Sequence, residues 1–303
     1  MSIMRLGYVH ARVTNLDEAA RHYGDTLGMT EVAKSPGTRY FKAWDEWDHH
    51  SVVIEEGGVG LVKLGYKCSK EDDLDSYEKS LTGFGVTVSR MSKGDNLAVG
   101  DGIRFTAPSG HVFELYHQIE YTGTETGSIN PDPWPRDQRG AAVQRLDHAL
   151  ITAEDVELME RMLIECFGWR PSERVVESAD NPALIGTWMY CGQTVHDLAI
   201  IKGDNGKLHH FAFLLDDWSQ VLKAGDVLAM NDVAVDTGPT RHGITRGKTI
   251  YFFDPSGNRN EVFAGGYVTN EDFPTITWTA DQLGKGIFYV QRELNDRFLT
   301  VFT

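Results

Sequence analysis

The sequence predicts an α+β protein built from two related modules and a C-terminal tail. Three observations predict it: the chain is long enough for two domains, two distant pairs of segments match each other, and a strand–helix–strands pattern recurs in each half. With 303 residues, 41% of them hydrophobic, two domains of about 150 residues are the simplest division. We expect a first module over 1–135, a second over 136–270 and the tail over 271–303.

Composition restricts the class of protein. The chain carries 29 Lys and Arg against 44 Asp and Glu, a formal charge of −15, so we expect no nucleic-acid or membrane partner. No apolar run approaches the ~20 residues of a transmembrane helix, and the first residues lack the pattern of a secretion signal. The three cysteines, Cys68, Cys166 and Cys191, form no close pair. We therefore expect a soluble, cytoplasmic protein without a disulfide framework.

The two modules are predicted from internal matches. Segments 5–29 and 145–169 both open with Arg-Leu and both place a glycine 23 residues later. Further along, RFTAPSGHVFELYH from Arg104 matches YFFDPSGNRNEVFAG from Tyr251, with a glutamate six residues after the proline in both. The offsets are 140 and 147 residues, which indicates one duplicated module with small insertions.

A shorter repeat lies inside the second module. RLDHAL at 145–150 resembles KLHHFA at 207–212, and each leads into an acidic helix start. We predict helices over 155–167 and 218–230, each followed by short segments of β character. The pattern thus occurs twice per module and four times in all. The Pro- and Gly-containing segment 127–140 has neither period and is predicted to link the modules.

Candidate metal ligands follow from this register. His148 and His210 occupy the same place in successive repeats, so related strands would direct both toward one point. The turn at 254–258 contains Pro and Gly where a tight turn needs them, and a hairpin symmetric about it places Tyr251 opposite Glu261. Two imidazoles and one carboxylate, with open positions left, are typical of non-haem Fe(II) oxygenases.

Three segments connect the chain to a known family: KLHHFAF at 207–213, GPTRHGITRGKTIYFFDPSGNRNEVFAGG at 238–266, and ITWTADQLGKGIFYVQRELNDRFLTVF at 276–302. Through them the sequence resembles, over essentially its whole length, the catechol 2,3-dioxygenases of the vicinal oxygen chelate superfamily. The resemblance implies a glyoxalase-like fold of βαβββ repeats whose strands form incomplete barrels. It also implies extradiol (meta) cleavage of catechol and small substituted catechols by dioxygen, giving 2-hydroxymuconic semialdehyde in aromatic degradation.

The resemblance also implies roles for individual residues. It makes Fe(II) the metal, with Mn(II) as a variant and no organic cofactor, and the ligands His148, His210 and Glu261. The acid–base and hydrogen-bonding residues would be His196, His242 and Tyr251, and the apolar pocket wall would include Trp188, Ile287 and Phe298. We expect His196 to act as the base that deprotonates the substrate. A homotetramer is implied, and a small ferredoxin is a candidate partner for re-reducing the iron.

The first module departs from this pattern. Tyr8 is expected where His148 stands and Leu64 where His210 stands, while Glu114 is kept. Arg104 takes the place of the tyrosine opposite that carboxylate, so a salt bridge is expected and no metal site. His209, next to His210 on its strand, is interpreted as a structural residue that faces the other side.

Two other functions remain open for the sequence. One is a non-oxidative lyase or isomerase of the same superfamily with another divalent metal, which would act without dioxygen. The other is a metal-free protein that binds an aromatic compound, which would retain no iron after purification.

Overall fold

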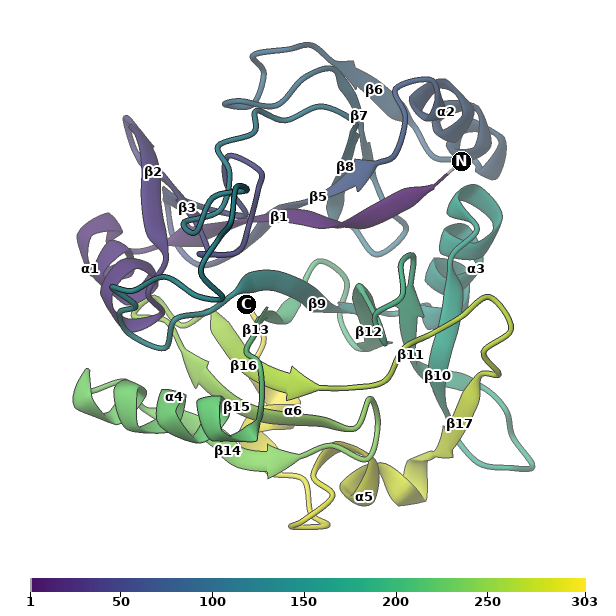
Figure 1. Ribbon diagram of the computed structural model, residues 1–303. Helices are drawn as coiled ribbons and strands as arrows, with labels where there is room; N and C mark the ends of the chain where they lie inside the picture. The colour runs from purple at the N-terminus through teal and green to yellow at the C-terminus, as the bar shows by residue number, and fades with distance from the viewer. Residues whose placement is uncertain (1) are drawn as a thin grey trace.

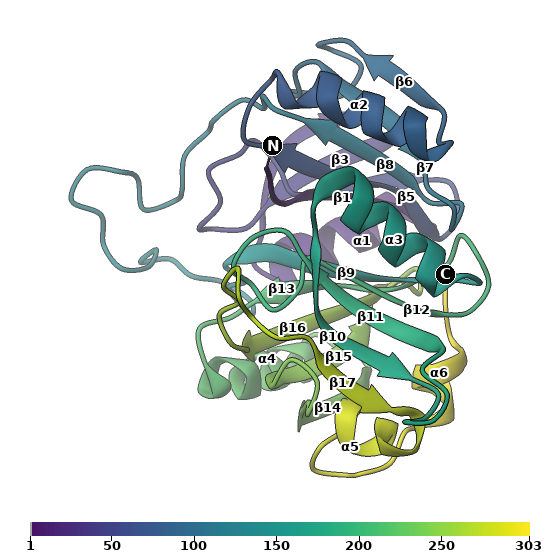
Figure 2. The same cartoon turned by 90° about the vertical axis from the view of Figure 1, so that its right-hand side faces the viewer.

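The computed structural model describes residues 2–303, which fold into two mixed β-sheets that lie one above the other in both views (Figures 1 and 2). The first sheet has eight strands, in the order β2-β3-β4-β1-β5-β8-β7-β6. Its elements are β1 (Ile3–Val13), α1 (Leu16–Arg21) with a π-helical turn (His22–Thr26), β2 (Thr30–Ser35), β3 (Thr38–Lys42), β4 (Val52–Glu56), β5 (Gly60–Cys68), α2 (Asp73–Phe84), β6 (Val88–Met91), β7 (Gly102–Thr106) and β8 (Val112–Tyr116).

The second sheet has nine strands, in the order β14-β15-β16-β13-β9-β12-β11-β10-β17. Its elements are β9 (Arg145–Ala153), α3 (Val156–Phe167), β10 (Arg170–Val176), β11 (Leu184–Tyr190), β12 (Leu198–Lys202), β13 (Leu208–Leu214), α4 (Trp218–Met230), β14 (Val235–Arg241), β15 (Gly247–Phe253), β16 (Arg259–Gly265) and β17 (Ile276–Thr279). Chain order therefore gives βαβββ four times, which confirms the predicted α+β architecture.

Local sequence accounts for the two predicted helices of the second module. Asp155 caps α3 by accepting a hydrogen bond from the Leu158 amide at 2.8 Å, and Asp217 caps α4 in the same way. Gly168 ends α3 at a φ of 70°, a conformation that side chains with a Cβ avoid. Helices over 155–167 and 218–230 are thus confirmed to within a residue.

The two sheets pack through a shared apolar core and a few buried polar contacts. Glu46 accepts hydrogen bonds from the amides of Ala43 and Leu146, at 2.7 and 2.8 Å, and so ties the first module to the start of β9. The segment between β8 and β9 loops away from the body in Figure 2 and contains neither helix nor strand, as predicted for 127–140. Within residues 2–303, no helix is long and apolar enough to cross a membrane.

The tail wraps around the second sheet. Strand β17 pairs in parallel with β10 at one edge, and the short helices α5 (Leu283–Ile287) and α6 (Asp296–Thr300) follow. The chain ends beside β13, where Thr303 and Leu208 exchange backbone hydrogen bonds of 2.7 and 3.0 Å. The tail therefore covers the strand that carries His210. The division at 135 and 270, and any role of the tail between subunits, stay predictions.

Candidate metal centre

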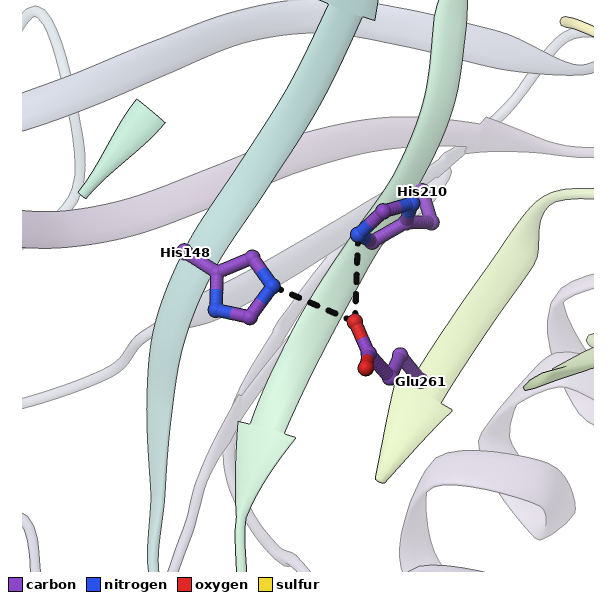
Figure 3. Close-up of side chains that lie close together, drawn as sticks. All are labelled: His148, His210 and Glu261. Carbon is purple, nitrogen blue, oxygen red and sulfur yellow. Dashed lines mark hydrogen bonds and ion pairs between the residues drawn. The ribbon is translucent and has the colours of Figure 1, made fainter. Parts of the chain in front are cut away.

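Three neighbouring strands bring His148, His210 and Glu261 together. His148 lies on β9, His210 on β13 and Glu261 on β16, and β13 pairs with both of the others. Ala212 of β13 stands between His148 and Glu261 in the register, which leaves room above its small side chain. Figure 3 shows both imidazoles directed at the carboxylate.

The three side chains have the geometry of a metal site. The Nε2 atoms of His148 and His210 lie 3.2 and 3.1 Å from Oε2 of Glu261. One ligand atom from each residue falls within 4.8 Å of the others, and all three side chains are buried. A buried carboxylate facing two imidazoles from one side is a donor set that Fe(II), Mn(II) or Zn(II) accepts.

Neighbouring groups orient two of these side chains. Nδ1 of His148 lies 3.0 Å from Oδ2 of Asp147, and the hydroxyl of Thr249 donates to Oε1 of Glu261 at 2.5 Å. Each contact occupies the atom that faces away from the cluster, as is common around protein metal ligands. Although burial alone would lower it, the carboxylates of Asp147 and Glu261 raise the pKa of His148 to about 9. Sequence reasoning missed Asp147 and Thr249, although the Asp-His pair of β9 offered a signal for the first.

The predicted acid–base residues lie beside this cluster. The rings of His196 and His148 have centroids 4.0 Å apart. Nε2 of His242 lies 2.9 Å from the hydroxyl of Tyr251, and its Nδ1 donates to the carbonyl of Ile287. Burial and the neighbouring imidazole of His148 hold the pKa of His196 well below its usual value.

The register of β15 and β16 places Tyr251 opposite Glu261, which confirms the pairing predicted from the turn. A cavity of about 1020 Å³ opens above the cluster, lined on one side by the polar groups just described. Its apolar wall includes all three residues predicted for it, Trp188, Ile287 and Phe298. The structure thus brings all nine predicted site residues to one cavity.

The ring of His209 does not face the other side of the sheet as expected, because it lines the same cavity as His210. Its Nδ1 lies 2.6 Å from Nδ1 of His210, and its Nε2 lies 2.9 Å from the carbonyl oxygen of Phe298 in α6. The pairing of β13 with β9 has a register shift between Leu208 and His210, so the alternation expected for a regular strand is interrupted at His209.

One expectation for the first module is wrong. Lys63, and not Leu64, stands where His210 stands, because Lys63 pairs with His10 in β1 as His210 pairs with Leu150 in β9. The inserted residues of the second module all precede β13, so the later offset already applies at this strand. Since a shift of one residue changes the face of a strand, Leu64 points into the core instead.

The retained carboxylate of the first module is neutralised by cations. Arg104 contacts Oε1 of Glu114 at 2.6 Å, which confirms the predicted salt bridge, and Lys63 adds a second at 3.1 Å. The hydroxyl of Tyr8 also donates to Glu114. Within residues 2–303, the only group of three or more His, Cys, Asp or Glu side chains placed to hold a metal ion is that of His148, His210 and Glu261.

Two family models match parts of the chain. Residues 145–262 match the family described as Glyoxalase/Bleomycin resistance protein/Dioxygenase superfamily. Residues 63–120 match the Catechol 2,3-dioxygenase-like N-terminal domain.

Individual relatives agree with these matches. The chain is 42% identical to a metapyrocatechase of Pseudomonas sp. (strain CF600), over 99% of both chains. It is 28% identical to a manganese-dependent 2,3-dihydroxybiphenyl 1,2-dioxygenase of Geobacillus genomosp. 3, over 96% of this chain and 95% of the other. The crystal structure of the 2,3-dioxygenase LapB from Pseudomonas sp. KL28 superposes with a TM-score of 0.89 at 40% identity, covering 93% of this chain and 99% of that one.

Proposed function

Since the chain belongs to the metapyrocatechases, extradiol ring-cleaving dioxygenases of the Glyoxalase/Bleomycin resistance protein/Dioxygenase superfamily, we propose that it cleaves its substrate at an Fe(II) ion. The enzyme performs meta cleavage of catechols. The finer proposal is that catechol and small substituted catechols are converted to 2-hydroxymuconic semialdehyde at a centre held by His148, His210 and Glu261. Its main support is that both imidazole Nε2 atoms converge within 3.2 Å of one carboxylate oxygen.

The residues around the cluster suggest how the substrate is held and deprotonated. Bound between these ligands, Fe(II) would bring catechol and dioxygen to one centre and carry electrons between them. His196 lines the cavity next to His148, within reach of a substrate held at the cluster, and we assign it the role of accepting a proton from a catechol hydroxyl. Since Nδ1 of His242 donates to Ile287, a neutral His242 would accept from Tyr251 through Nε2, which would leave the Tyr251 oxygen a lone pair for the substrate.

The cavity favours a flat aromatic molecule with polar groups at one end. The side opposite the metal cluster is apolar, with Trp188, Ile244 and Ile287 among its residues. The ring of a catechol would lie against these residues while its two oxygens face the histidines. Closure of this wall by the tail would exclude water from the reacting oxygens.

One experiment tests the function directly. Metal-free protein is loaded with Fe(II) without air, catechol is added in air, and the yellow product and oxygen consumption are followed together. Loading with Mn(II) in parallel decides between the two metals. Product formed without oxygen uptake would instead select a lyase or isomerase, and failure to bind either metal would select a binding protein.

Two substitutions test the residue roles. H210A should lose the metal, whereas H196F should keep it and lose turnover. The duplicated fold offers a matched control in His50, which precedes β4 as His196 precedes β12, so H50F should leave turnover unchanged. Metal retention in H210A, or normal turnover in H196F, would contradict the assignments. The homotetramer, the ferredoxin partner and the cytoplasmic location stay predictions of the sequence.

A further inference from the structure

The most informative polar contact outside the ligand set joins the metal cluster to the tail. It runs from the carbonyl oxygen of Phe298 to Nε2 of His209, at 2.9 Å, and from Nδ1 of His209 to Nδ1 of His210, at 2.6 Å. Nε2 of His210 then faces Oε2 of Glu261 at 3.1 Å. The contact connects α6 to the cluster through two adjacent imidazoles.

The carbonyl of Phe298 determines which ring nitrogens of His209 and His210 carry protons. A carbonyl oxygen only accepts hydrogen bonds, so His209 must donate through Nε2. The ring of His209 is buried, and the Arg259 guanidinium donates to its own backbone carbonyl at 3.3 Å. With its one proton on Nε2, a neutral His209 presents the lone pair of Nδ1 to Nδ1 of His210. The proton between the two Nδ1 atoms then belongs to His210.

This proton position matters because His210 has two possible acceptors. If its single proton were on Nε2, it would be donated to Glu261, and the nitrogen facing the cluster could not bind a metal. Two bare Nδ1 atoms would then face each other at 2.6 Å and repel. With the proton on Nδ1, the contact is a hydrogen bond and the Nε2 lone pair points at the cluster.

We propose that His209 is a positioning residue that fixes the tautomer in which His210 presents Nε2 to the metal, with the tail carbonyl of Phe298 as the reference point. The inference rests on the metal site proposed above. It goes beyond that site because it assigns a role to a residue that binds neither metal nor substrate, and to a backbone group of the tail.

The tail carbonyl is itself held in place. Asn295 caps α6 by accepting from the Phe298 amide at 2.7 Å. The buried guanidinium of Arg259 donates to the carbonyls of Val301 and Arg297, at 2.8 and 3.1 Å, and forms a salt bridge with Asp236. The end of α6 is thus anchored to the same strands that carry the ligands.

Two variants separate the hydrogen bond from simple packing. In H209F the ring remains but its acceptor is lost, so the affinity for Mn(II) should fall by about 10–100-fold. In H209N the side-chain oxygen stands as many bonds from Cβ as Nδ1 does, so it can still accept from His210, and the affinity should stay within about threefold of the original chain. The free Mn(II) signal in electron paramagnetic resonance measures both.

A matched control comes from His111. Its Nε2 also lies 3.0 Å from a backbone carbonyl, that of Lys207, and its Nδ1 contacts Ser109 at 2.9 Å, yet it touches no candidate ligand. H111F should lower thermal stability and leave the Mn(II) affinity unchanged.

The tautomer is observed directly in metal-free protein. Nitrogen-15 spectra of histidine-labelled chain should show a protonated Nδ1 on His210 and a bare Nδ1 on His209. The reverse assignment would overturn the proposal, whether or not H209F folds, and so would equal Mn(II) affinity in folded H209F and the unsubstituted chain. If the unsubstituted chain binds neither Mn(II) nor Fe(II), the proposed function fails together with this inference; if it binds and only the H209F result disagrees, the inference alone fails.

Discussion

Replacing Glu114 by Gln should destabilise the first module severely, because it leaves a buried cation without its partner. The side chain of Glu114 is fully buried, and that of Lys63 is only 11% exposed. Arg104 is 41% exposed and can turn toward water, whereas the more buried ammonium of Lys63 would keep the neutral amide oxygen of Asn96, at 2.5 Å, in place of a carboxylate. Removing one partner of a buried ion pair typically costs about 3–5 kcal/mol, and we expect E114Q to lower the free energy of unfolding by that amount.

A second substitution shows the origin of the loss. K63M in the E114Q background removes the stranded charge, so the double variant should recover most of the stability, with a coupling energy of about 2–4 kcal/mol. Urea unfolding followed by tryptophan fluorescence gives the free energy of unfolding of the unsubstituted protein, E114Q, K63M and the double variant. E78Q is the control, because it breaks an exposed pair with Arg90 and should cost under about 1 kcal/mol. Additive effects of the two substitutions would refute the reasoning, and catechol turnover should survive in every folded variant.

Three further predictions concern the metal ligands and pH. T249V removes the hydrogen bond that holds the carboxylate of Glu261, so metal affinity should fall by about 2- to 10-fold. The control T187V removes a similar buried hydrogen bond, to Glu160, and should lower only stability. Equal metal affinity in both variants would contradict the role of Thr249 in orienting Glu261. Burial raises the pKa of Glu46 from its ordinary value of 4.5 to about 6, so the stabilisation by its proton is complete below pH 4.5 and is lost as the pH rises through 6. E46Q should reduce the change in unfolding free energy between these pH values by about 2 kcal/mol, and an unchanged pH profile would contradict the shift. Chelation should lower the melting temperature, and Fe(II) at a hundred times its dissociation constant should restore about 2.7 kcal/mol, while an unaffected melting temperature would argue against a metal in the folded protein.

Much of the candidate site could be predicted because local patterns carry it. The turn at 254–258 determines which residues of its hairpin stand opposite, and the structure places Tyr251 opposite Glu261 as expected. The repeat register brought His148 and His210 to equivalent strands. The same register failed at Leu64, where the position of the insertion decides which residue faces the site and only strand pairing reveals it.

By itself, the sequence determined the duplicated βαβββ order, the helix ends and the identity of the candidate ligands, since caps, turns and repeats are written in side-chain types. Only the tertiary structure decided that Lys63 pairs with the Glu114 carboxylate of the first module and that His209 contacts His210 and the tail. The reason is physical: strand register depends on pairings between distant segments, and every residue has a backbone carbonyl. No pattern of side chains distinguishes the carbonyl of Phe298 from any other until the fold brings it against an imidazole.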